Sequence, residues 1–402
     1  MLMRLKNSTA CAISFFLKNK MNWKIPLSDI EIGDLEVTAV ERVLRSRWLS
    51  MGSVTQEFEQ AFARFIGVKH AFAVTNATAA LHLAYMALGI GPDDEVIVPS
   101  LTFVATANAI LYTGARPVFA EIQSPQDLNI SPDDIVRRIT PRTRAIAVVH
   151  YGGYICDMPQ ISAIAEKHGL ALIEDAAHAP GAVLNGRKAG TFGDLACFSF
   201  FSNKNITTAE GGMVVTDRDD LAERLRLMRS HGMTTLTWDR HRGHAHTYDV
   251  VALGYNYRID EIRSALGLAQ LGPLEARNAR RQQIVNRYRS ELSGAGGLSI
   301  PFAHVPSGAA HYIFPVLLDK ADVRLDFMQR LKEEGIQTSI HYPPIHLFEY
   351  YRERFAYAPG DLPTTENVCA RQVTLPLYPT MEEAEIGLVC DIVRQTLADL
   401  NH

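Results

Sequence analysis

The chain has 402 residues, of which 47% are hydrophobic, and its mean hydropathy is close to zero. A chain of this length and composition can bury one large core and a smaller second domain. Forty basic and 44 acidic residues give a net charge of −4 without a long basic run, which argues against nucleic acid or an anionic membrane as a partner. Five scattered cysteines without a Cys-x-x-Cys spacing favour reduced thiols in the cytoplasm over a disulfide framework or a zinc site.

The first residues differ in pattern from the rest of the chain. Eight apolar-leaning residues, 10–17, stand between the basic positions Lys6 and Lys18. Eight are too few to cross a bilayer, and no convincing signal-peptide cleavage site follows them. We therefore expect an N-terminal extension over residues 1–21 that is disordered or stems from a misassigned start, and whose deletion leaves activity intact.

Apolar runs typical of strands alternate with helical patterns between Asp34 and Gly190. These runs lie at residues 71–74, 95–99, 117–120, 145–150 and 171–174. The alternation predicts right-handed βαβ units and a mainly parallel sheet. Two more buried strands are expected at 195–201 and 213–215, and the second follows a Glu-Gly-Gly turn closely enough to pair antiparallel.

Lys204 lies in the short polar break between these last two runs. A lysine amine held between buried strands loses solvation, which lowers its pKa and frees the neutral amine to attack a carbonyl. Those are the properties of a Schiff-base lysine. A loop lysine that extends into water is the alternative, and the neighbouring motifs decide against it.

Asp175 ends the apolar run at 171–174. Chemistry in open α/β sheets gathers at the carboxyl ends of strands, although the segment alone fits a helix N-cap equally well. Together with Lys204, Asp175 suits the ring nitrogen of pyridoxal 5′-phosphate (PLP), which a carboxylate keeps protonated. His178 could hydrogen-bond the phenolic oxygen of that ring, and a structural histidine is the alternative there.

A phosphate-binding turn is expected at residues 74–84, which read as a strand end, a polar turn and an Ala/Leu-rich helix. Backbone N–H groups and the helix dipole suit a dianionic phosphate, and the hydroxyl of Thr78 adds a donor. Ser199, five residues before Lys204, can add another. The alternative is an ordinary helix cap without a ligand.

These motifs together resemble the DegT-type (DegT/DnrJ/EryC/StrS) sugar aminotransferases, which are fold-type I PLP enzymes. Five segments in family order carry the resemblance: Thr75–Ala84, Pro99–Ala109, Glu174–His178, Ser199–Gly212 and Gly254–Asp260. The resemblance implies an α/β fold in which residues 22–257 form a large PLP-binding domain around a mainly parallel seven-stranded sheet flanked by helices. A linking helix and a smaller α+β domain would follow over residues 258–402.

The resemblance also implies roles for individual residues. Lys204 corresponds to the lysine that forms a Schiff base with PLP and then shuttles a proton. Asp175 corresponds to the partner of the pyridine nitrogen, and His178 to a position near the phenolic oxygen. Phe103 matches the aromatic residue that stacks on the ring.

Other matches concern the phosphate and the second subunit. Thr78 and Ser199 match phosphate contacts, while Ala77 lies in the phosphate turn where many members have glycine. Asn256 matches a residue that contacts phosphate from the neighbouring subunit, which implies a homodimer with active sites at the interface. Phe201 replaces a histidine common in the family, and we expect it to tune the substrate pocket.

The C-terminal part is expected to begin with a helical stretch at 259–292, broken at Gly272-Pro273. Strands are expected at 312–318 and 337–340, and helices at 324–334 and 381–397.

Two polar clusters are candidates for contacts with the substrate. Residues 236–246 contain three histidines and two arginines, lack the spacing of a metal site, and favour a mobile loop whose Arg240 or Arg242 could bind a diphosphate. The His341–His346 segment resembles the family's pocket-facing segment, and structural histidines are equally compatible with it. The substrate candidates are Arg242, His341, Tyr342 and His346, and no metal site is expected.

The expected reaction is a transamination from an amino acid, L-glutamate by resemblance, to a keto sugar. The resemblance favours a nucleotide-linked 4-keto-6-deoxyhexose as acceptor. A scyllo-inosose-type cyclitol and a 3-keto nucleotide sugar are the alternatives. A non-catalytic PLP-binding regulator belongs to another class, and it is disfavoured because every chemical position is filled and no DNA-binding module is present.

Overall fold

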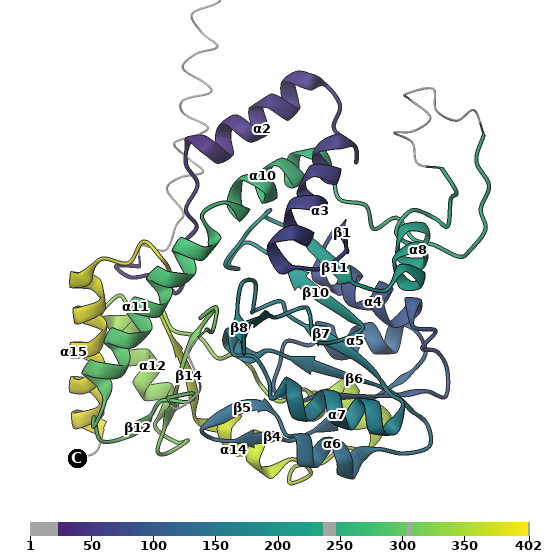
Figure 1. Ribbon diagram of the computed structural model, residues 1–402. Helices are drawn as coiled ribbons and strands as arrows, with labels where there is room; N and C mark the ends of the chain where they lie inside the picture. The colour runs from purple at the N-terminus through teal and green to yellow at the C-terminus, as the bar shows by residue number, and fades with distance from the viewer. Residues whose placement is uncertain (1–22, 236–246, 304–307, 401–402) are drawn as a thin grey trace, which may run out of the picture.

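The computed structural model describes residues 23–235, 247–303 and 308–400 (Figure 1). The predicted N-terminal extension and the substrate candidates Arg240 and Arg242 lie outside the described residues. Within the described ranges, no helix is long and apolar enough to cross a membrane.

A seven-stranded sheet forms the centre of the larger part of the molecule. Its strand order is β1-β11-β10-β7-β6-β2-β3, and only β11 runs antiparallel to its neighbours. The strands are β1 (His70–Val74), β2 (Glu95–Pro99), β3 (Arg116–Ala120), β6 (Thr143–Val149), β7 (Ala171–Asp175), β10 (Leu195–Ser199) and β11 (Gly212–Thr216). The predicted α/β class, the mainly parallel sheet and the antiparallel last strand are confirmed.

Both faces of this sheet are buried, which explains why its strands are continuously apolar. In β6, Ala145 and Ala147 face one core, whereas Ile146 and Val148 face another on the opposite side. The first face is covered by α4 (Ala77–Ala87), α5 (Ala105–Tyr112) and α8 (Asp219–Met228). The other is covered by α3 (Ser53–Ile66), α6 (Pro132–Arg138) and α7 (Met158–His168).

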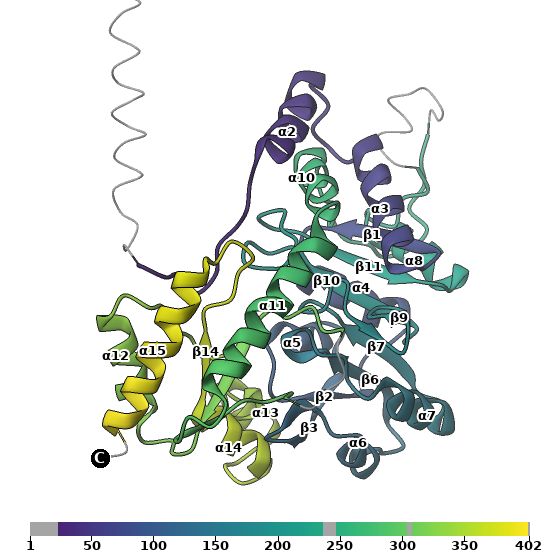
Figure 2. The same cartoon turned by 60° about the vertical axis from the view of Figure 1, so that its left-hand side comes forward.

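Two helices and several short elements complete the larger part. Helix α2 (Asp34–Ser46) packs on α10 (Glu261–Leu271), and the two lie side by side at the top of both views (Figures 1 and 2). The others are β4 (Ile122–Ser124), β5 (Asp127–Ile130), η1 (Tyr151–Gly153), β8 (Val183–Leu184) and β9 (Arg187–Lys188).

The chain then passes through α10 and α11 (Leu274–Leu292) to a smaller sheet of order β12-β13-β14. The predicted break at Gly272-Pro273 is confirmed, since it separates the two helices. The elements of this part are β12 (Leu298–Ser299), β13 (Phe314–Leu318), α12 (Arg324–Glu333), η2 (Ile345–Leu347), α13 (Glu349–Phe355), α14 (Pro363–Arg371), β14 (Gln372–Leu375) and α15 (Glu383–Leu400). Helices α11, α12 and α15 pack together beside this sheet (Figure 2).

The strand predicted at residues 337–340 is wrong. The N–H of Gln337 donates to the carbonyl of Ile25, and only Ser339 exchanges hydrogen bonds with Thr374 of β14. The segment therefore divides its backbone bonds between two partners and makes a single bridge instead of a ladder. The third strand of the small sheet is β14, which pairs with β13 over four residues.

Candidate active site

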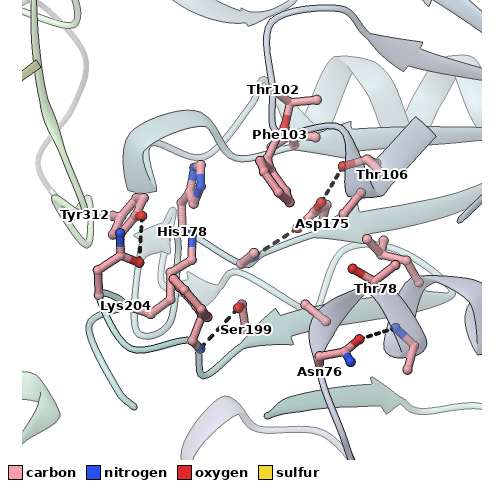
Figure 3. Close-up of a pocket in the computed structure, with 18 of the residues that line it drawn as sticks. Asn76, Thr78, Thr102, Phe103, Thr106, Asp175, His178, Ser199, Lys204 and Tyr312 are labelled. Carbon is pink, nitrogen blue, oxygen red and sulfur yellow. Dashed lines mark hydrogen bonds between the residues drawn. The ribbon is translucent and has the colours of Figure 1, made fainter. Parts of the chain in front are cut away.

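A cavity of about 730 Å³ opens at the carboxyl ends of β6 and β7, beside the starts of α4 and α5 (Figure 3). This edge of a parallel sheet is where ligands bind in open α/β folds. The small part of the chain closes one side, because Tyr312, His341 and Tyr342 also line the cavity.

Lys204 lies in the turn after β10, and its backbone N–H donates to the carbonyl of Phe201 at 2.9 Å. Its Nζ stands 3.9 Å from the centre of the Tyr312 ring. Burial lowers the pKa of Lys204 to about 7, although the carboxylate of Asp175 acts in the opposite direction. The lysine therefore has an appreciable neutral fraction near neutral pH, as its place between buried strands predicts.

Asp175 is the last residue of β7 and is buried. Burial raises the pKa of its carboxyl, while a hydrogen bond from the hydroxyl of Thr106 opposes the shift. The Thr106 hydroxyl lies 2.6 Å from Oδ2, and the N–H of Ala177 lies 3.1 Å from Oδ1. Residues 176–182 form turns, so the alternative of a helix N-cap at Asp175 is not realised.

His178 is held in one tautomer by its neighbours. Its Nδ1 accepts the N–H of Gly152 at 3.3 Å, which leaves the proton on Nε2, 3.2 Å from the hydroxyl of Tyr342. Burial, and then the charge of nearby Lys204, holds the pKa of His178 well below its usual range. The imidazole is therefore neutral and acts as a donor through Nε2.

The N-terminus of α4 forms one wall of the cavity. Asn76 caps the helix, since its Oδ1 accepts the N–H of Ala79 at 2.8 Å. The N–H groups of Ala77 and Thr78 donate to no acceptor among the described residues, and both residues line the cavity. Gly212 packs against this turn so closely that a Cβ there would lie 2.6 Å from the carbonyl carbon of Asn76.

Five further residues singled out from the sequence line the same cavity: Phe103, Ser199, Phe201, His341 and Tyr342. The Ser199 hydroxyl accepts the N–H of Phe201 at 3.3 Å, and the ring of Phe103 lies 5.9 Å from that of Tyr342. The Nδ1 of His341 lies 2.9 Å from the hydroxyl of Thr374, and burial lowers the pKa of this histidine to about 4. Phe201, where many relatives are expected to carry histidine, is also in the wall.

The structure does not place His346 in the cavity, so its proposed contact with substrate is wrong. The side chain is fully buried, with Nδ1 2.7 Å from the hydroxyl of Ser100 and Nε2 3.1 Å from Glu366. Both nitrogens are satisfied by structural partners that join the end of β2 to η2 and α14. Asn256 is exposed and does not line the cavity of its own chain.

Sequence reasoning missed two residues that touch the central groups. Thr106 lies within the Pro99–Ala109 segment, three residues after Phe103, and that one-turn spacing could have suggested a shared cavity face. Tyr312 stood only at the start of a predicted strand. No local signal distinguishes it from a core aromatic residue, because its contact with Lys204 joins distant segments.

A parallel sheet with a lysine of lowered pKa, a buried carboxylate and a helix N-terminus around one cavity defines a fold-type I PLP enzyme. A family model described as the DegT/DnrJ/EryC1/StrS aminotransferase family matches residues 31–394, and the chain belongs to that family. It is a PLP-dependent sugar aminotransferase.

Individual relatives match along nearly their whole length. The chain is 42% identical over 380 residues to the spore coat polysaccharide biosynthesis protein SpsC of Bacillus subtilis (strain 168), covering 93% of this chain and 97% of that protein. The structure of Helicobacter pylori PseC, an aminotransferase of pseudoaminic acid biosynthesis, superposes with a TM-score of 0.88 at 30% identity, covering 93% and 99% of the two chains. The structure of DesI in the presence of its TDP-sugar product gives a TM-score of 0.83 at 35% identity, with 94% and 93% covered.

The residues present fit PLP. At the N-terminus of α4, the N–H groups of Ala77 and Thr78 have no acceptor in the part of the chain that the structure describes, and they suit the phosphate of PLP. Gly212 beside them leaves the turn open, because a Cβ there would collide with it. The buried carboxylate of Asp175 suits a protonated ring nitrogen, and the amine of Lys204 suits a carbonyl carbon.

Proposed function

We propose that this enzyme transfers an amino group from L-glutamate to a nucleotide-linked 4-keto-6-deoxyhexose. The observation that carries the proposal is the convergence of Lys204, Asp175 and the α4 N-terminus on one cavity. The similarity to DesI, which was solved with a TDP-sugar product, supports a nucleotide-linked acceptor. The similarity to SpsC supports a place in polysaccharide biosynthesis.

The residues expected to hold the cofactor have the following roles in this proposal. When bound, PLP supplies an electron sink for the carbanion that forms when the donor loses its α-proton. Lys204 would hold the cofactor through its amine, and the neutral amine would move the α-proton of the donor. The carboxylate of Asp175 would keep the ring nitrogen positively charged, and Nε2 of His178 would donate to the phenolic oxygen. Phe103 covers the ring.

The remaining contacts concern phosphate and the dimer. Ala77, Thr78 and Ser199 bind phosphate through N–H and hydroxyl groups. Asn256 would reach the phosphate of a neighbouring subunit, which would make the active unit a homodimer with sites at its interface. The exposed apolar residues close to Asn256 in sequence, Val250, Val251 and Leu253, support a buried surface in that assembly.

The substrate contacts remain part of the proposal. His341 and Tyr342 line the cavity and would contact the acceptor. Arg242 would pair with the diphosphate of a nucleotide sugar through two parallel hydrogen bonds. Its segment lies outside the described residues.

The test begins with enzyme converted by glutamate to the pyridoxamine form. A nucleotide-linked 4-keto-6-deoxyhexose is then added, and the yellow absorption of the pyridoxal form should return. Lys204→Ala is the control, because it should bind pyridoxamine phosphate but not turn over. If the colour fails to return although the glutamate step works, the acceptor is instead a cyclitol, a 3-keto nucleotide sugar or another free ketone.

A further inference from the structure

The amine of Lys204 lies against the face of a tyrosine from the opposite side of the cavity. Its Nζ is 3.9 Å from the centre of the Tyr312 ring, well within the distance of a cation–π contact. Lys204 follows β10 of the large sheet, whereas Tyr312 stands just before β13 of the small sheet. The contact therefore joins the two parts of the chain at the reacting amine (Figure 3).

Tyr312 is held by its hydroxyl, its backbone N–H and a stacking partner of its ring. Its hydroxyl donates to Oδ1 of Asn203 at 3.1 Å, and its backbone N–H donates to the carbonyl of Gly152 at 2.9 Å. The ring stacks on the imidazole of His178 with 4.4 Å between centres and 26° between planes. A ring held by two hydrogen bonds and a stacking partner presents a fixed face to Lys204.

None of the other described groups around Lys204 pairs with its amine, so the Tyr312 ring is the contact that orients it. Asp175 favours the charged amine, but no carboxylate among the described residues forms an ion pair with Nζ. The imidazoles of His178 and His341 also face Lys204, and both are neutral because burial lowers their pKa. Neither imidazole pairs with the amine. His178 is hydrogen-bonded to Gly152 and Tyr342, and His341 is hydrogen-bonded to Thr374.

We propose that Tyr312 is a positioning residue that holds the amine of Lys204 inside the cavity while the lysine is not bonded to the cofactor. The inference rests on the proposed function, in which the free lysine moves the donor's α-proton. A flexible four-carbon side chain has many conformations, and the ring restricts it to those that keep the amine near the reacting carbon. The hydroxyl of Tyr312 serves only to fix the ring.

The test compares Tyr312→Leu with Tyr312→Phe, because both variants lose the hydroxyl and only one loses the ring. Tyr312→Met provides a second variant without a ring in case the leucine variant folds poorly. Retained cofactor absorption and an unchanged unfolding temperature serve as the check on folding. The full-length enzyme is used in its pyridoxamine form, in which the amine of Lys204 is free.

The first measurement does not depend on turnover. Reductive methylation of Lys204 by formaldehyde and cyanoborohydride is followed against pH by peptide mass spectrometry. The ring stabilises the ammonium form, so the midpoint should fall by about one pH unit in the leucine and methionine variants and stay unchanged in the phenylalanine variant.

The second measurement is the single-turnover reaction of the pyridoxal form with glutamate. The rate constant should fall about tenfold in the variants without a ring, while the glutamate dissociation constant and the phenylalanine variant change little. A lower pKa alone would supply more neutral amine and speed the reaction at pH 7, so a slower rate indicates lost positioning.

Equal midpoints and equal rates in the leucine and phenylalanine variants would overturn the inference. A wild-type enzyme that binds PLP but does not react with glutamate would instead overturn the proposed function. The methylation profile would still report on the contact between ring and amine in that case, so the two failures are distinguishable.

Discussion

At Asp175 a hydroxyl from a neighbouring helix opposes the effect of burial. The Thr106 hydroxyl donates to Oδ2 at 2.6 Å, and this bond lowers a pKa that burial raises. A carboxylate with fewer donors holds its negative charge less well, and therefore supports a protonated ring nitrogen less well. Removing the hydrogen bond between Thr106 and Asp175 should consequently lower the rate of transamination.

Thr106→Val should lower kcat by about tenfold with little change in KM, because a hydrogen bond to a charged group contributes about 1.5–3 kcal/mol. Thr106→Ser keeps the hydroxyl and is the matched control, with a rate close to that of the wild type. Steady-state kinetics on all three enzymes provide the measurement. A valine variant as active as the serine variant would show that the bond does not matter.

The pKa of Lys204 also affects stability. It falls from 10.5 to about 7 through burial, so between these values the unfolded chain binds a proton that the folded chain lacks. The free energy of unfolding of the cofactor-free protein should therefore rise with pH across this window. Below pH 7 Lys204 is charged in the folded state, and the cost of burying this charge lowers the free energy of unfolding by its full amount.

Lys204→Met should consequently make the cofactor-free protein more stable by roughly 2–4 kcal/mol at pH 6.5, a range reduced from the full pKa difference because the cavity is open to water. The gain should disappear toward pH 10.5. Urea unfolding at several pH values measures it. A gain that does not depend on pH would mean that packing, and not charge, explains the difference.

Among the elements, helix α3 begins without a side-chain cap of its own, because Gly52 precedes it. Glu261, at the start of α10, supplies the cap from a distant segment. Its carboxylate accepts the N–H groups of Gly52, Val54 and Thr55 at 2.8, 2.9 and 2.8 Å, and the hydroxyl of Thr55 at 2.7 Å. The negative charge also lies at the positive end of the α3 dipole.

Glu261→Gln should lower the free energy of unfolding by roughly 2–4 kcal/mol, since a neutral amide cannot accept all four bonds and one buried donor loses its partner. Glu166→Gln, on an exposed position of α7, is the control and should change stability by less than about 0.5 kcal/mol. Chemical denaturation measures both. Equal effects in the two variants would contradict the capping role.

For the whole molecule, the exposed apolar residues near Asn256 bear on the proposed dimer. Leu253 is 75% exposed in the single chain, and Val251 beside it is also exposed. Such residues lose contact with water when a second chain covers them, and each contributes roughly 1–3 kcal/mol on burial.

Changing Val251 and Leu253 together to Asp should give a monomer that has lost most of its activity, because each site would lack the Asn256 of its neighbour. Leu325→Asp, on α12 and 71% exposed, is the control and should remain a dimer. Analytical ultracentrifugation and glutamate turnover measure the two effects. An active monomer would exclude a site shared between subunits.

Much of the fold could be predicted because each strand is a continuous apolar run. The sheet strand predicted at 95–99 agrees with β2 in both bounds, and the break at Gly272-Pro273 follows from local residue chemistry. The prediction of a strand at 337–340 was wrong because strand formation depends on which segment is available for backbone pairing. There, Ile25 and Thr374 share the backbone bonds of the segment.

The sequence by itself determined the class of fold from its alternating apolar runs, and it indicated the family through the resemblance of five motifs. It also placed Asp175 at a strand end, Thr78 at a helix start and Lys204 in the break between two strands. Only the tertiary structure decided which distant residues meet them. It placed Tyr312 against Lys204 and removed His346 from the cavity to a buried pair with Ser100 and Glu366. Periodicity within one segment reports burial and secondary structure, whereas contacts between segments depend on how their faces pack.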